Sequence, residues 1–147
     1  MNNSVEILLV EDNPADIRLT QEAFKEAKIH NNLHVVQDGM SAVEFIRQEG
    51  PYKNAPRPDL ILLDLNLPKM DGREVLQIIK TGSETMQIPV VILTTSEDEE
   101  DVLRSYKLHA NAYLVKPIDM MQFIKMIKQL EGFWLSVVKL PPKPESS

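Results

Sequence analysis

Short apolar runs alternate along this chain with longer stretches in which apolar residues recur with the period of a helix. The apolar runs predict β-strands at residues 5–10, 33–36, 59–63, 89–94 and 111–115. Strands that alternate with helices in this way are typical of repeated βα units around a parallel sheet. The pattern therefore predicts an α/β protein.

The first helix has the clearest boundaries. Asn13 is in the position of an N-cap and Pro14 follows at the first helical position, while the helical period fades near Lys28. The other predicted helices are residues 41–48, a helix after Asp71 and Gly72, a helix from Ser96 with Glu99 at the capping-box spacing, and residues 120–134. Asp71 is interpreted as a structural residue of the turn before its helix.

Polar side chains follow four of the predicted strands at the point where each strand ends. Glu11 and Asp12 follow the first strand, Asp64 follows the third, Thr94 is the last residue of the fourth, and Lys116 follows the fifth. The carboxyl ends of parallel strands share one edge of a sheet, and open α/β sheets bind ligands there. Three carboxylates, a hydroxyl and an ammonium at one edge suit phosphoryl transfer to an aspartate with a divalent metal.

Carboxylates so close together repel one another unless a cation lies among them. Mg²⁺ prefers oxygen ligands and takes one or two carboxylates together with water and phosphate oxygens. Asp12 and Asp64 are predicted as direct ligands, with Glu11 acting through water or orienting Asp12, and the backbone carbonyl of Asn66 completing the shell. Taken singly, Asp12 is better interpreted as a helix-capping residue, so the metal prediction rests on the joint pattern.

Lys116 and Thr94 are predicted to contact the transferred phosphoryl group. An ammonium pairs with the incoming charge, and a hydroxyl donates a hydrogen bond to a phosphoryl oxygen. Alone, Thr94 would be ordinary strand sequence and Lys116 a surface lysine. Their positions after separate strands of one sheet favour the functional interpretation.

Composition limits the remaining possibilities. The chain has 147 residues, no cysteine and a net charge of −6. This length suits one compact domain, and the lack of cysteine excludes disulfides and thiolate chemistry. The acidic balance argues against direct nucleic-acid binding. The first residues predict neither a signal peptide nor a membrane helix, so we expect a cytoplasmic protein that does not bind membranes.

Taken together, these residues resemble a response-regulator receiver domain of two-component signalling. The matching features are Glu11 and Asp12, the segment 62–68 with Met70, Asp71 and Gly72, then Thr94, Tyr113, and Lys116 with Pro117. The resemblance implies a doubly wound (βα)5 fold with the flavodoxin-like strand order 2-1-3-4-5 and a cis peptide before Pro117. It also implies that Asp64 is the phospho-acceptor. Because Thr94 and Tyr113 lie towards the ends of the fourth and fifth strands, they are predicted to form the switch.

A narrower similarity connects the chain to stand-alone receivers that are paired with phytochrome-type sensor histidine kinases. It is carried by residues 52–58, 105–109 and 133–135, together with Leu140 and Pro141. It implies a sensor histidine kinase as phosphoryl donor and a downstream protein whose identity the sequence does not give. One departure from the family pattern is Thr95, where receivers often have alanine, and it is interpreted as tuning access to Asp64.

Three rival functions are weighed against this one. A haloacid-dehalogenase-like phosphohydrolase would also use an aspartate and Mg²⁺, but it needs a carboxylate where this chain has Asn66. A flavodoxin-like FMN carrier needs a phosphate loop after the first strand, where Glu11 and Asp12 would repel phosphate. A receiver that is never phosphorylated would not need Asp64. The chain is therefore expected to be a signalling switch and not an enzyme.

The carboxyl-terminal end is predicted to mediate self-association. Residues 5–131 are assigned to the receiver domain and residues 132–147 to an extension that contains Phe133 and Trp134. Its apolar residues exceed what one helical stripe needs for docking on a sheet. The alternative is that the extension covers its own domain. A homodimer would use Phe133 and Trp134 as its aromatic anchors.

Overall fold

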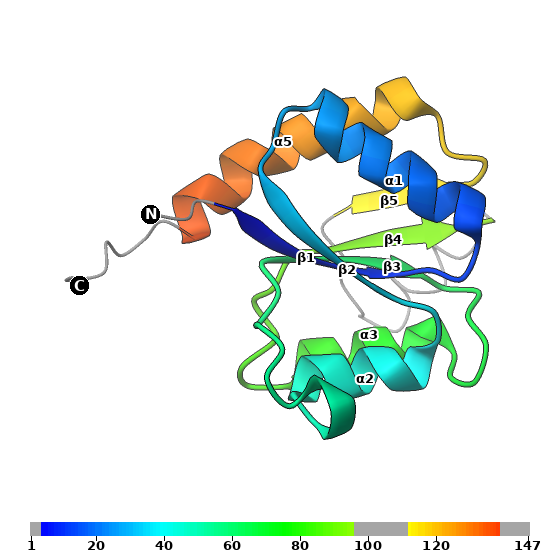
Figure 1. The fold of residues 1–147 in the computed structure, drawn as a ribbon, viewed down its shortest axis with the longest axis vertical. Coiled ribbons are helices and arrows are strands. Elements are labelled where there is room, and N and C mark those ends of the chain that lie inside the picture. The colour runs from blue at the N-terminus through cyan, green and yellow to red at the C-terminus, as the bar shows by residue number, and fades with distance from the viewer. Residues whose placement is uncertain (1–3, 96–111, 139–147) are drawn as a thin grey trace.

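The structure is a computed structural model that describes residues 4–95 and 112–138, with side chains as far as Leu130. Five parallel strands form one sheet in the order β2-β1-β3-β4-β5 (Figure 1). The strands are β1 (Val5–Val10), β2 (Asn31–Val36), β3 (Leu60–Asp64), β4 (Val90–Thr94) and β5 (Ala112–Val115). The predicted α/β class and the strand order implied by the resemblance are confirmed.

Helices cover both faces of the sheet. They are α1 (Pro14–Glu26), α2 (Gly39–Arg47), α3 (Gly72–Thr81) and α5 (Met120–Val138), and a short 3-10 helix, η1 (Gly50–Tyr52), follows α2. Helices α1 and α5 lie on one face, and α2 and α3 lie on the other (Figure 1). The helix predicted from Ser96 lies outside the described residues. None of the helices in the described ranges is both long and apolar enough to cross a membrane.

Alternate residues of the central strands enter two separate cores. Leu8 and Val10 of β1 pack with α2 and α3 in what we call the α2/α3 core. Ile7 and Leu9 pack with α1 and α5 in the α1/α5 core. Because both faces of a doubly covered sheet are buried, its inner strands have continuous apolar sequences in place of alternating ones.

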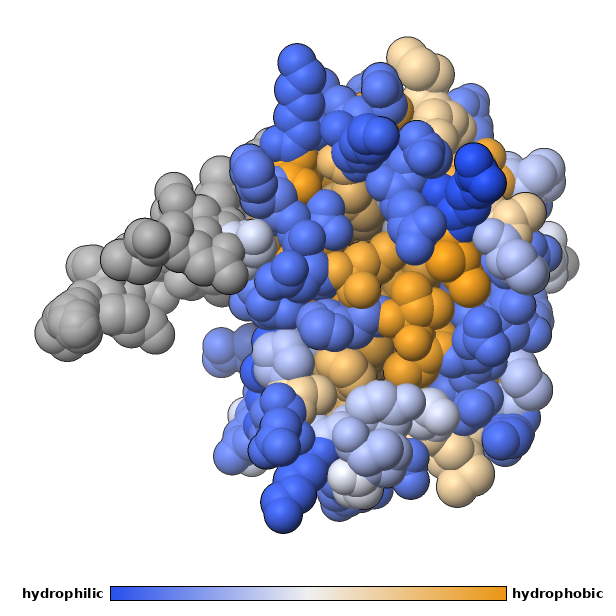
Figure 2. All heavy atoms as spheres, viewed as in Figure 1, coloured by the Kyte–Doolittle hydropathy of each residue, from blue (hydrophilic) through white to orange (hydrophobic). Residues whose placement is uncertain are grey.

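The edge of the sheet at β2 is less completely covered. Apolar side chains gather on this side of the molecule between the two helical layers (Figure 2). Val35 of β2 is 36% exposed, whereas the residues of β3 are all buried. Strand β2 begins at Asn31, two residues before the predicted start, and the side chain of Asn32 donates to Glu6 of β1 over 2.8 Å. This hydrogen bond between neighbouring strands helps to explain why β2 includes the polar residues Asn31 and Asn32.

Capping residues determine where the helices begin. The side chain of Asn13 accepts hydrogen bonds from the backbone N–H groups of Ala15 and Asp16, as expected of the N-cap before Pro14. Helix α2 begins at Gly39, earlier than predicted, because Asp38 accepts from the backbone of Ser41.

The remaining helix boundaries follow from turn geometry and helical continuity. Asp71 caps α3 and accepts from the N–H of Arg73, which confirms its structural role. Helix α1 ends at Glu26, before Lys28 adopts a positive φ of 60°. Helix α5 continues to Val138, four residues beyond its predicted end at Trp134.

Candidate functional site

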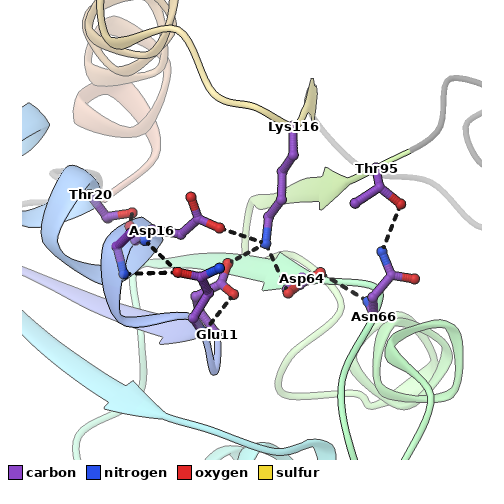
Figure 3. Close-up of polar contacts among 9 residues, drawn as sticks. Glu11, Asp16, Thr20, Asp64, Asn66, Thr95 and Lys116 are labelled. Atoms are coloured by element: carbon purple, nitrogen blue, oxygen red, sulfur yellow. Dashed lines mark hydrogen bonds and ion pairs between the residues drawn. The ribbon is translucent and has the colours of Figure 1, made fainter.

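Strand ends bring charged groups from three parts of the chain to one edge of the sheet. Glu11 directly follows β1, Asp64 is the last residue of β3, and Lys116 directly follows β5. Their side chains converge in Figure 3. The peptide bond between Lys116 and Pro117 is cis, as the resemblance implied. The structure therefore joins three of the residues that the sequence predicted for the site.

The ammonium of Lys116 lies at the centre of this group. Its Nζ is 2.9 Å from Glu11 Oε1, 3.1 Å from Asp64 Oδ2 and 3.0 Å from Asp16 Oδ2 (Figure 3). The contacts to Glu11 and Asp64 are hydrogen bonds donated by Lys116, and the contact to Asp16 is an ion pair. Charge-assisted hydrogen bonds of this kind are stronger than those between neutral groups.

The sequence interpretation missed Asp16. The residue lies in the first turn of α1, where acidic side chains are common because they complement the helix dipole. That ordinary explanation gave no reason to connect it with Lys116. The available signal was indirect: a helix that begins at the functional edge of the sheet directs its first turn towards that edge.

Burial and neighbouring charges shift the pKa values of Glu11 and Lys116. The side chain of Glu11 is completely buried and accepts a hydrogen bond from the N–H of Asn13. Its burial, together with the charge of nearby Asp64, raises the pKa of Glu11 to about 7, although Lys116 opposes this shift. Burial of the Lys116 ammonium favours its neutral form, but the carboxylates outweigh burial and raise the pKa of Lys116 above its ordinary value.

Asp12 completes a cluster of carboxylates that we call the acidic cluster. Glu11, Asp12 and Asp64 each present an oxygen, and these oxygens lie within 4.8 Å of one another. Asp12 is exposed, so the cluster opens to solvent on that side. Three carboxylate oxygens form a hard donor set, which suits a divalent cation such as Mg²⁺ or Mn²⁺ and does not suit a thiophilic metal.

The loop after β3 forms the next part of the site. The N–H of Asn66 donates to Asp64 Oδ1 over 2.9 Å, and the side-chain amide of Asn66 donates to Thr95 Oγ1 over 3.2 Å (Figure 3). One oxygen of Asp64 is therefore held by the backbone and the other by Lys116. Thr95, which departs from the family pattern, links this loop to the end of β4.

The predicted switch residues lie on neighbouring strands. Thr94 is the last residue of β4 and is buried, and it is in register with Val115 of β5. Tyr113 of β5 is half-buried and packs against the α2/α3 core. Phe133 and Trp134 lie on the last part of α5, where the structure describes the backbone alone.

Comparison with known proteins identifies the family. The family model of the response regulator receiver domain matches residues 7–128. The chain belongs to this family. The match includes all of the strand-end residues discussed above, and a phosphohydrolase function finds no support in it.

Individual relatives resemble this receiver over most of their length. Response regulator Rcp1 of Synechocystis sp. strain PCC 6803 is 53% identical over 135 residues, which cover 92% of each chain. The crystal structure of the phosphorylated cyanobacterial phytochrome response regulator RcpA is 52% identical with a TM-score of 0.78, and covers 94% of this chain and 99% of that one. The Mn²⁺-bound form of Rcp1 is also 52% identical, with a TM-score of 0.77 and coverage of 93% and 99%.

Proposed function

We propose that this receiver accepts a phosphoryl group on Asp64 from a phosphohistidine of a sensor histidine kinase and passes the signal on by a conformational change. The observation that carries the proposal is the position of Asp64, which ends β3 beside the only ammonium among the described residues that contacts the acidic cluster. The phosphorylated state of the similar RcpA structure is further support. The role proposed is signalling in the cytoplasm and not enzymatic turnover.

The transfer is a displacement at phosphorus. A carboxylate oxygen of Asp64 forms the new P–O bond while the P–N bond to the donor imidazole breaks, and the imidazole keeps the electron pair and takes up a proton. Lys116 is within reach of Asp64 Oδ2 and can follow the phosphoryl oxygens as their charge arrives. The buried Thr94 hydroxyl is proposed to donate to another of these oxygens.

Mg²⁺ is proposed as the cofactor. Asp12 and Asp64 would be its direct ligands, with Glu11 contributing through water and Asn66 through its backbone carbonyl. A bound divalent cation would neutralise the charge that develops on the transferred group. Support comes from the all-oxygen donor set and from the Mn²⁺-bound form of the similar Rcp1.

Thr94 and Tyr113 are proposed to convert phosphorylation into a change of shape. A hydrogen bond from Thr94 to the phosphoryl group exists only in the phosphorylated state, so it favours that conformation. Movement of Thr94 would open space at the ends of β4 and β5, and Tyr113 could turn into it. Tyr113 is half-buried, so the core does not enclose its side chain on every side.

The first prediction tests the acceptor. Wild type and Asp64→Asn are incubated with a small phosphodonor, with Mg²⁺ or with a chelator, and the covalent product is measured by mass spectrometry. Labelling is expected only for wild type with Mg²⁺. Asp59→Asn is a matched control. Asp59 is a half-buried carboxylate that directly precedes the first residue of β3, at the end of the strand away from Asp64. Labelling of Asp64→Asn, or labelling that resists chelation, would contradict the proposal.

The partner is tested separately. We propose a phytochrome-type kinase because the similar RcpA is described as a phytochrome response regulator. A panel of purified, radiolabelled histidine kinases that includes phytochrome-type members should transfer label most rapidly from the latter. Equal transfer from all kinases would reject this choice of partner while leaving the role of Asp64 intact. The downstream protein is a separate question, to be addressed with the phosphorylated form as bait.

A further inference from the structure

Three carboxylates surround the ammonium of Lys116. Its Nζ donates hydrogen bonds to Glu11 over 2.9 Å and to Asp64 over 3.1 Å, and it forms an ion pair with Asp16 at 3.0 Å. An incoming phosphoryl oxygen therefore competes with these carboxylates for the ammonium of Lys116. The consequence depends on which carboxylate is easiest to release.

The three carboxylates differ in their access to water. The side chains of Glu11 and Asp64 are 0% and 3% exposed, whereas that of Asp16 is 20% exposed. A buried carboxylate that loses its counter-ion is left without solvation, which is costly. Bond formation to phosphorus removes the charge of Asp64 itself, so Glu11 and Asp16 are the carboxylates that still compete with the phosphoryl oxygens for Lys116. Asp16 can be hydrated when Lys116 leaves, so it is the more easily exchanged of these two. It also lies outside the acidic cluster that suits a metal ion.

We propose that Asp16 is a positioning residue for the phosphorylation reaction, which holds Lys116 in the unphosphorylated state and releases it to the phosphoryl group. This inference rests on the proposed function of Asp64. The contact between Asp16 and Lys116 stabilises the ground state and is weakened as the phosphoryl group arrives. An interaction that is stronger in the ground state than in the transition state slows the reaction. Asp16 therefore influences how fast Asp64 is phosphorylated.

The test compares rates of labelling with a small phosphodonor at saturating Mg²⁺. Asp16→Asn removes the charge that retains Lys116, and we expect labelling about two- to fivefold faster than in wild type, the range for loss of a partly exposed charge pair. A rate equal to or below that of wild type would overturn the proposal. Saturating metal ensures that a change in metal affinity does not alter the comparison.

A control variant moves the negative charge from position 16 to position 15. It distinguishes the effect of the contact with Lys116 from effects of net charge and of helix stability. Ala15 is exposed and adjacent to Asp16 in the first turn of α1. The double variant Ala15→Asp/Asp16→Asn keeps the first-turn negative charge, so its thermal stability should return towards that of wild type. Its labelling rate should remain as fast as that of Asp16→Asn, because the contact with Lys116 is lost. A return to the wild-type rate would show that the effect is not due to this contact.

The outcomes for this inference and for the proposed function are distinct. If wild type is labelled on Asp64 but Asp16→Asn is not accelerated, the inference on Asp16 fails and the proposed function stands. If wild type is not labelled on Asp64, both fail. Acceleration in both Asp16 variants, with a melting temperature that differs between them, supports a positioning role that helix stability does not explain.

Discussion

Asp38 illustrates how one side chain connects helix formation to pH. Its Oδ1 accepts from the backbone N–H of Ser41 over 2.8 Å, and Lys69 approaches its Oδ2 to 3.8 Å. The hydrogen bond from Ser41, aided by the charge of Lys69, lowers the pKa of Asp38 below its usual range. The folded state therefore favours the ionised carboxylate, which stabilises the protein above the ordinary aspartate pKa. This contribution is lost as the pH falls through the lower pKa of the folded state.

We predict that Asp38→Ala lowers the free energy of unfolding by about 1 kcal/mol at neutral pH, since it removes an N-cap. Asp38→Asn keeps an acceptor and should cost less. Urea denaturation at neutral pH and in acid, below the ordinary aspartate pKa of about 3.9, measures both effects. The difference between wild type and Asp38→Ala should shrink in acid. A difference that is constant with pH would show that the charge of Asp38 contributes nothing.

At the scale of elements, the close contact between α3 and the end of β3 supports the site. Gly72 begins α3, and a Cβ there would lie 2.6 Å from Leu65 Cα and 2.7 Å from the carbonyl oxygen of Asp64. Backbone atoms cannot move away without displacing Asp64. We predict that Gly72→Ala lowers the free energy of unfolding by about 1–3 kcal/mol and also slows labelling of Asp64. Denaturant titration and the labelling assay measure the two effects.

Gly82, which caps the other end of α3, is the matched control. A Cβ there would approach Thr85 Oγ1 to 2.5 Å, and this hydroxyl donates to the carbonyl of Ile79. Gly82→Ala should therefore reduce stability without slowing the labelling of Asp64. Equal slowing in both variants would mean that lost stability, and not the position of Asp64, limits the reaction.

The same scale shows how far sequence patterns predict structure. Strands β1, β3 and β4 were predicted closely because continuous burial requires continuous apolar sequence. The start of β2 was missed because Asn31 and Asn32 are polar, and the hydrogen bond from Asn32 to Glu6 forms only after the strands pair. Local periodicity in the sequence does not predict such contacts between distant residues.

The functional site also contains both contacts that the sequence predicted and a contact that it did not. The strand-end positions of Asp64 and Lys116 indicated that they would meet, and they do so at 3.1 Å. Their meeting follows from the parallel sheet that the alternating pattern predicts, together with the strand order that the resemblance implies. The salt bridge from Lys116 to Asp16 depends on the direction in which α1 leaves the sheet. The sequence indicates this direction only indirectly, through the start of α1 at the functional edge, so this partner of Lys116 was not predicted.

At the scale of the whole molecule, we propose that residues 132–147 are an extension that mediates dimerisation. Helix α5 continues without a break to Val138. Met121 of α5 is 74% exposed and Val115 of β5 is 40% exposed, so apolar surface is already available on these elements. An isologous dimer would bury this surface on both subunits. We predict that the double variant Phe133→Asp/Trp134→Asp is monomeric at micromolar concentration, whereas wild type sediments as a dimer.

Met86 provides the control for this prediction. It lies between α3 and β4 and is 50% exposed, so Met86→Asp removes an apolar side chain from a different surface. Sedimentation of this variant should match wild type. A wild type that is monomeric both before and after phosphorylation, or a dimer that tolerates both substitutions in the extension, would exclude the proposed interface.

The division of the interior by the sheet has an evolutionary consequence. Leu8 and Leu9 are adjacent in sequence but belong to different cores, whereas Leu8 shares the α2/α3 core with Ile79. Substitutions at well-separated residues that share no partners change stability almost additively, as expected for most pairs of residues in different cores. A lineage can therefore exchange the residues of one core without first adapting the other. Substitutions in the two cores can then accumulate independently of each other during evolution.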